Sequence, residues 1–119
     1  MNTTYAKLLV IVLIFLGESL AIYAEMWGAH QGAFDNKPWM QIFFKMFLII
    51  TISGGLLISG YMLGFKAFQN IWMVSVTSIT SILIVEPMLA YVFFRQMPTL
   101  GATVGLVLGA IGFLATIFI

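Results

Sequence analysis

Four long apolar stretches divide the chain, and they cover residues 5–27, 39–65, 70–94 and 98–119. Each stretch is close to the roughly 20 residues that a helix needs to cross the hydrocarbon core of a bilayer. None has the alternation of apolar and polar residues that is typical of a membrane β-strand. The pattern therefore predicts an all-α integral membrane protein, a single module (1–119) built as a bundle of four transmembrane helices.

The links between these stretches differ in length and composition. Residues 28–38, GAHQGAFDNKP, have the composition of a loop, and we expect a loop over the whole segment. The links at 65–69 and 95–98 are short, and Pro98 suits the first turn of the last helix. Trp27 and Trp39 flank the long link, where aromatic side chains settle at the level of the lipid headgroups.

Composition supports the assignment to a membrane protein and argues against a nucleic-acid-binding protein. Of 119 residues, 62% are hydrophobic and 8% are charged, and the mean hydropathy is +1.12. A net charge of +1 without a basic stripe argues against nucleic acid as a partner, and membrane lipids are the expected surroundings. The cations divide almost evenly between the two ends of the helices and do not fix an orientation. Either a partner sets the orientation, or the chain inserts both ways, or the few charges carry no information.

Glu18 is the residue that best indicates function. It lies near the centre of the first span, where an ionised carboxylate is costly unless it faces the bundle or a wet cavity. Lys7, Glu18 and Glu25 fall within about 20° of one another around an ideal helix, so they share one face. Glu18 either exchanges a proton and a cation or only bonds a neighbouring helix, and we favour the first. Glu25 lies near the interface and is expected to be solvated.

The third span carries a polar stripe. Ser75, Ser78 and Glu86 project within about 80° of each other, so they could line a substrate or proton pathway. Alternatively, the hydroxyls bond neighbouring helices or their own preceding carbonyls. Glu86 precedes Pro87, which removes a backbone donor and conflicts with the carbonyl of Leu83, so a kink is expected there.

The C-terminal part of the chain resembles a known family. Residues 85–113, VEPMLAYVFFRQMPTLGATVGLVLGAIGF, are similar to the C-terminal hairpin of drug/metabolite transporter superfamily modules, with a Glu-Pro pair and a glycine-rich final helix. Length and span count resemble the small multidrug resistance family, and Glu18 falls at the position of that family's first-helix glutamate. Residues 70–76 depart from the family pattern, because Met73 and Val76 occupy positions that are usually aromatic.

The resemblance implies a partner and a location. Members form homodimers, or heterodimers with a related module, in bacterial inner membranes. They exchange protons for cationic or guanidinium-like compounds, and some relatives move lipid-linked sugars. It also implies that the small-residue stripe of the last helix is a dimer interface. That stripe consists of Gly101, Gly105, Gly109 and Gly112. Gly60 and Gly64, in the second span, are expected to serve packing within the bundle instead.

Catalytic and metal-binding patterns are missing from the sequence. His30 stands alone in the expected loop with Asp35 nearby, which is typical of a solvated residue and not of a metal site. There is no phosphate-binding Gly-Lys-Ser/Thr loop, no cysteine and no Ser/His/Asp set. We therefore expect neither an enzyme nor a bound cofactor.

Three functional hypotheses follow. The first is a proton-coupled secondary transporter module that exports a small cationic or amphiphilic compound as a dimer, with Glu18 as the coupling carboxylate. The second is a flippase subunit for a lipid-linked sugar, for which the missing aromatic positions matter less. The third is a scaffold subunit of a larger membrane complex that transports nothing and in which Glu18 and Glu86 pair with partner residues.

Overall fold

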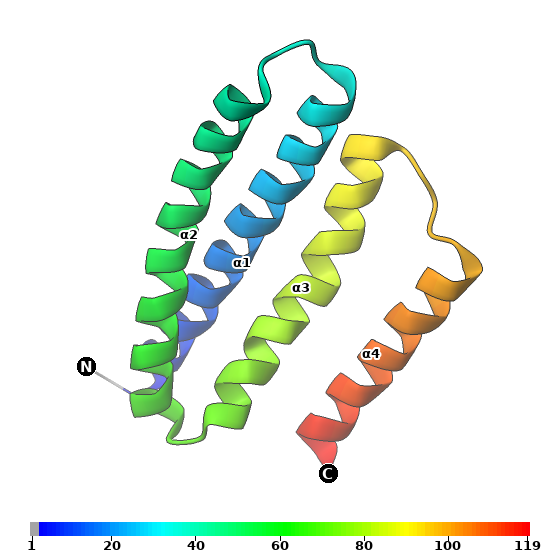
Figure 1. The fold of residues 1–119 in the computed structure, drawn as a ribbon. Helices are drawn as coiled ribbons and strands as arrows, with labels where there is room; N and C mark the ends of the chain where they lie inside the picture. The colour runs from blue at the N-terminus through cyan, green and yellow to red at the C-terminus, as the bar shows by residue number, and fades with distance from the viewer. Residues whose placement is uncertain (1–2) are drawn as a thin grey trace.

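The computed structural model describes residues 3–119 and consists of four helices (Figure 1). Their bounds are α1 Thr3–Phe34, α2 Trp39–Phe68, α3 Ile71–Phe94 and α4 Leu100–Phe118. All four are long and apolar enough to cross a membrane. The predicted fold class, an all-α multi-pass integral membrane protein of four helices, is confirmed. Met1 and Asn2, which the predicted module includes, lie outside the described residues.

The first helix is longer than the sequence pattern predicts. Residues 28–34, expected to belong to a loop, continue α1 for two further turns, and only residues 35–38 link α1 to α2. Packing explains the difference, because Gly28 lies directly against Met46 of α2. Gln31 is 5% exposed, so this part of α1 is enclosed by its neighbours instead of standing in solvent. The loop prediction for 28–34 was therefore wrong.

Local side-chain chemistry sets the start of α3. Gln69 follows α2 in the left-handed conformation, with φ 54°, and donates its backbone N–H to the carbonyl of Phe65. Asn70 then caps α3 by accepting a hydrogen bond from the backbone N–H of Trp72 at 3.0 Å. An asparagine side chain in this place satisfies one of the donors that the first turn of a helix leaves free. The short link predicted from the sequence is thus a turn of two residues.

The start of α4 differs from the prediction in its details. Thr99, not a residue further upstream, is the N-cap, and its hydroxyl accepts from the backbone N–H of Ala102 at 3.1 Å. Pro98 lies one residue before this cap, so its predicted place in the first turn of the helix was wrong. The reason is that a threonine hydroxyl can bond a free amide of the first turn, which a proline ring cannot do.

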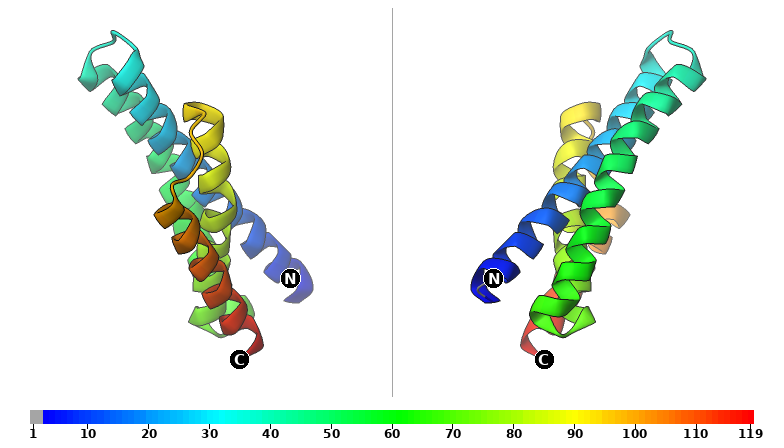
Figure 2. Two further views of the ribbon diagram at one scale, coloured as in Figure 1. Left: turned by 90° about the vertical axis from the view of Figure 1, so that its right-hand side faces the viewer. Right: turned by 90° about the vertical axis from the view of Figure 1, so that its left-hand side faces the viewer.

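The four helices form an open layer, not a closed square bundle. The α1 helix lies between α2 and α3, and α4 packs against α3 alone. Figure 2 shows α1 and α2 tilted together relative to α3, so that they cross it at an angle. The Cα atoms extend over 49 × 34 × 16 Å. No residue of α4 is buried, whereas each of the other three helices contributes buried residues.

Glycines allow the first three helices to approach closely. A Cβ atom on Gly60 would lie 2.7 Å from Ile14, and one on Gly64 would lie 2.9 Å from Val74. Ile14 and Val74 are fully buried at this contact, together with Val10. The prediction that Gly60 and Gly64 serve packing within the bundle is confirmed.

Candidate functional site

The side chain of Glu18 lies where α1, α2 and α3 meet. By the rise of an α-helix, its Cα is about 22 Å along α1 from Thr3, close to the middle of the helix. Glu18 is half-buried. Its neighbour Gly17 is buried against α2, where a Cβ atom would lie 2.8 Å from the Leu57 side chain.

A single hydroxyl from α3 binds the carboxylate. Ser78 donates its Oγ proton to Oε1 of Glu18 at 2.5 Å. This length is at the short end of the range for a hydroxyl that donates to an ionised carboxylate. Ser78 is 6% exposed, so the bond is shielded on the α3 side. Within residues 3–119, Ser78 is the one hydrogen-bond partner of this carboxylate.

The α2 helix holds the backbone at the same level. Ser53 donates its hydroxyl to the backbone carbonyl of Gly17 at 2.8 Å, and Ser53 is 1% exposed. The residue before Glu18 is thus fixed from α2, while the carboxylate itself is fixed from α3. The sequence interpretation missed Ser53, although a lone serine beside Gly54 and Gly55 in an apolar span was the available signal.

The other hydroxyls of α3 do not reach another helix. Thr77, Thr80 and Ser81 each donate to the carbonyl four residues earlier in their own helix. The sequence left this kind of bond open as an alternative for Ser75 and Ser78, but the side chains that make it are Thr77, Thr80 and Ser81. Ser78 is the exception, since it bonds Glu18 of α1. Ser75, predicted to share its role, is half-buried and makes no hydrogen bond to Glu18.

Two further carboxylates, Glu25 of α1 and Glu86 of α3, lie outside the Glu18–Ser78 pair. Glu25 of α1 is within electrostatic range of both Glu86 and Glu18. Glu86 is half-buried, whereas Glu25 is exposed. No three acidic or imidazole groups among residues 3–119 come together in a way that could hold a metal ion. Within residues 3–119, the three carboxylates are therefore separate groups and do not form one cluster.

Three of the five lysines and arginines, Lys7, Lys45 and Arg95, lie near aromatic rings. Lys7, which shares a predicted helix face with Glu18, has its ammonium 5.4 Å from the centre of the Phe68 ring. The Lys45 ammonium lies 3.8 Å from the Trp27 ring, and this contact joins α2 to α1. Within residues 3–119, no lysine or arginine forms an ion pair with Glu18, so its charge has no internal counter-ion.

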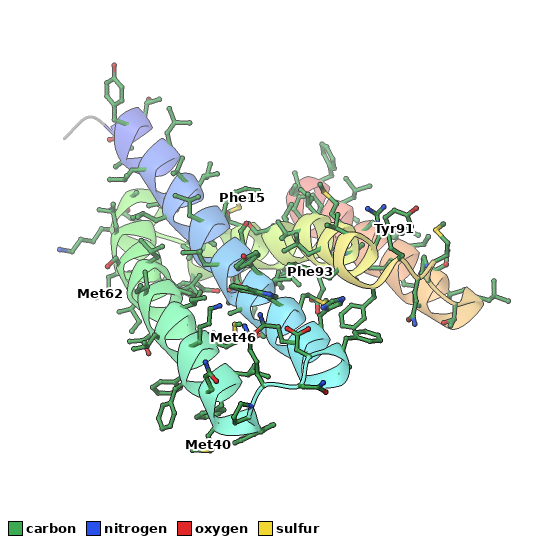
Figure 3. The ribbon with its side chains drawn as sticks, turned by 90° about the horizontal axis from the view of Figure 1, so that it is seen from above. Phe15, Met40, Met46, Met62, Tyr91 and Phe93 are labelled. Atoms are coloured by element: carbon green, nitrogen blue, oxygen red, sulfur yellow. The ribbon has the colours of Figure 1, made fainter. Side chains whose placement is uncertain are left out.

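A cavity of about 610 Å³ separates the C-terminal half of α3 from the N-terminal half of α4. Glu86 and Pro87 of α3 and Gly105 of α4 are among the residues that line it. Met26 of α1 lines it as well. Tyr91 lies on the α4 side of α3, whereas Phe93 lies on the α1 side (Figure 3). The predicted polar stripe is therefore divided, with Ser78 facing α1 and Glu86 lining the α3–α4 cavity.

His30 belongs to an aromatic cluster and not to a solvated loop. It lies within α1, and its ring centre is 4.9 Å from that of Phe34 and 5.6 Å from that of Phe94. Phe93 completes the cluster at 6.2 Å. The prediction of a solvated loop residue was wrong because the additional turns of α1 bring His30 beside the end of α3.

The glycines of α4 face mostly open space. A Cβ atom on Gly101, Gly105 or Gly112 would have no neighbour within 4 Å. Gly109 differs, since a Cβ atom there would lie 3.2 Å from the Leu83 side chain of α3. The stripe thus contacts α3 at one position, and its predicted role as a dimer interface stays a prediction.

We compared the chain with protein families and with individual proteins. No family model, curated protein or solved structure matches it. The similarity of residues 85–113 to drug/metabolite transporter modules therefore stays a prediction.

Proposed function

We propose that this chain is a secondary transporter module of the drug/metabolite type. Glu18 exchanges a proton for a small cationic or amphiphilic substrate, and two modules work together as a dimer. The observation that supports this proposal is the environment of the Glu18 carboxylate. It is half-buried in the middle of α1, held by one hydroxyl and without a counter-ion among residues 3–119.

The chemistry of such a carboxylate supports coupling. One hydroxyl donor does not neutralise a full negative charge in a medium of low polarity, so an ionised Glu18 would remain costly inside a membrane. Either a proton or a substrate cation removes that cost. Since both bind the same oxygen atoms, they exclude each other. That exclusion is what a carrier needs in order to exchange one for the other.

The surrounding helices support a carrier and not merely a packing contact. Ser53 and Gly17 fix the backbone, and Ser78 fixes one carboxylate oxygen. The group stays half-exposed at the surface of a layer that is only 16 Å thick across its Cα atoms. One module is therefore too thin to enclose a substrate on both sides. A second module would close the site, which is why the proposal includes a dimer.

The test is substrate flux driven by a pH gradient in proteoliposomes, with tetraphenylphosphonium and guanidinium as probes. The Glu18→Gln variant keeps the size of the side chain and an acceptor for Ser78 but removes the titratable charge. We expect it to fold and to lose coupled flux of whichever probe the wild-type protein carries.

The matched control is Asp35→Asn, which also replaces a carboxylate by its amide, at an exposed position just beyond the end of α1. We expect this variant to retain coupled flux. A Glu18→Gln protein that couples flux to the gradient as the wild type does would refute the role of Glu18. Absence of gradient-driven flux of either probe in the wild type would count against the transport of simple cations.

A further inference from the structure

The cavity between α3 and α4 lies between their contact at Leu83 and Gly109 and the link that joins the two helices. The two helices touch where Leu83 packs on Gly109, with 3.2 Å between the Leu83 side chain and a Cβ position on Gly109. From there the cavity runs to the link at residues 96–99, which forms the other end. Its volume of about 610 Å³ falls within the roughly 300–1,000 Å³ that is usual for sites of drug-sized ligands.

Two hydrogen-bond acceptors lie in the same part of the wall. Glu86 lines the cavity, is half-buried and has no cationic partner among residues 3–119. Pro87 also lines it, and a proline has no N–H to donate to the carbonyl four residues earlier. The carbonyl of Leu83 therefore lacks its usual helical donor, one turn before Glu86 and in the same stretch of wall.

The rest of the wall is predominantly apolar. Its apolar residues include Met26, Ile82, Ala90, Phe94, Met97 and Leu106. From Glu86 to Phe94, α3 advances about 12 Å, so the apolar wall continues well beyond the carboxylate. The cavity thus combines a negative group and a free carbonyl with space for an apolar body.

We propose that this cavity binds a primary amine that carries a compact apolar body. The ammonium would donate N–H bonds to the Glu86 carboxylate and the Leu83 carbonyl, and the body would lie along the apolar wall. Hydrogen bonds between charged groups are shorter and stronger than neutral ones, so N–H donors are favoured over a cation without them. The site is separate from the Glu18–Ser78 pair, and the inference does not depend on the role proposed for Glu18.

The experiment is NMR of methyl-¹³C-methionine protein in phosphatidylcholine nanodiscs. The probe is 4-phenylbutylamine at neutral pH, and its N,N,N-trimethyl analogue has the same charge and body but no N–H. Met26 and Met97 line the cavity, whereas Met62 lies exposed on α2 and reports non-specific partitioning. We expect saturable shifts of Met26 and Met97 with the amine, and at least about tenfold weaker binding of the analogue.

Two pairs of variants test the charge of Glu86 and the volume of the cavity separately. Glu86→Gln removes the charge, and we expect about tenfold weaker amine binding, whereas Asp35→Asn, at an exposed position outside the cavity, leaves binding unchanged. Gly105→Leu fills the cavity and abolishes binding. Gly112→Leu makes the same change in open space on the same helix, beyond the Leu83–Gly109 contact and outside the cavity lining, and preserves it.

The outcomes distinguish this site from the proposed transport site. Glu18→Gln is expected to keep amine binding even where it loses coupled flux. Equal affinity for the amine and its trimethyl analogue would overturn the inference, because the N–H donors would then be irrelevant. It would also be overturned if Glu86→Gln and Gly105→Leu, both folded, bound the amine as the wild type does.

Discussion

The contact of α1 with its two neighbours and the contact of α3 with α4 use the same residue type with opposite results. In the first region, Gly17, Gly60 and Gly64 are buried, and a Cβ atom on any of them would lie within 3.0 Å of a neighbouring side chain. In the second region, Gly101 and Gly112 of α4 have open space at the Cβ position.

A small residue therefore permits close approach of two helices but does not create it. Each of the three inner glycines receives a bulky aliphatic side chain, contributed by Leu57, Ile14 and Val74. In lipid, helix association depends on such van der Waals fit, since there is little hydrophobic gain from leaving one apolar surface for another. The contact of α1 with α2 and α3, which we call the fitted region, holds Glu18 in place. The contact of α3 with α4, the unfitted region, leaves a cavity beside Glu86.

The most disruptive test of this comparison is Gly60→Leu. The added side chain would meet Ile14, including its backbone nitrogen at 3.5 Å from the Cβ position, so α1 and α2 must separate. We expect a loss of about 1–3 kcal/mol in the free energy of unfolding, which is the usual cost of overpacking. Unfolding in mixed micelles, followed by circular dichroism, measures it.

The control for that variant is Gly112→Leu, which makes the same change in α4 where a Cβ atom meets nothing within 4 Å. We expect its free energy of unfolding to remain close to that of the wild type. Equal destabilisation by the two substitutions would remove the distinction between the fitted and the unfitted regions.

A smaller effect is expected from Ser78→Ala, which removes the polar link between α1 and α3. Hydrogen bonds between helices in membrane proteins contribute about 0.6 kcal/mol on average, and a charged acceptor raises that value. We expect a loss of about 1 kcal/mol in the free energy of unfolding. A double-mutant cycle with Glu18→Ala, which removes the acceptor of this bond, isolates the pair. Ser75→Ala, one turn earlier, is the control, and a coupling energy near zero in the cycle would contradict the bond.

The smallest effect is expected at the one place where α4 meets α3. In Gly109→Ala the new methyl group would lie 3.2 Å from the end of the Leu83 side chain, which can shift to accommodate it. We expect a change of less than about 0.5 kcal/mol in the free energy of unfolding, as for a surface position. A large loss in the same micelle assay would mean that the α3–α4 contact is as closely fitted as the inner one.

Helix identity was predictable because it depends on local properties of the chain. Runs of about 20 apolar residues must satisfy their backbone internally in hydrocarbon, so they form helices whatever their neighbours are. The predicted limits therefore agree with α2 and α3 to within a few residues. Thr99 is an instructive miss, because a threonine ahead of a glycine-rich helix is itself a capping signal.

The end of α1 was not predictable on the same grounds. Residues 28–34 contain two glycines and a histidine, which in isolation favour a loop. Met46 packs on Gly28, and Phe94 packs on His30, so contacts with α2 and α3 decide the outcome. Tertiary packing regularly overrides such weak local preferences.

By itself, the sequence determined four membrane-length helices. It also identified Glu18 as a carboxylate whose ionised form is energetically costly near the middle of the first helix. Only the tertiary structure decided that Ser78 binds this carboxylate, that Ser53 holds the backbone beside it, and that Glu86 belongs to a different cavity. Hydropathy and periodicity describe one helix at a time. The rotation and offset of each helix against the next depend on side-chain fit between residues far apart in the chain, such as Gly60 with Ile14 and Gly109 with Leu83.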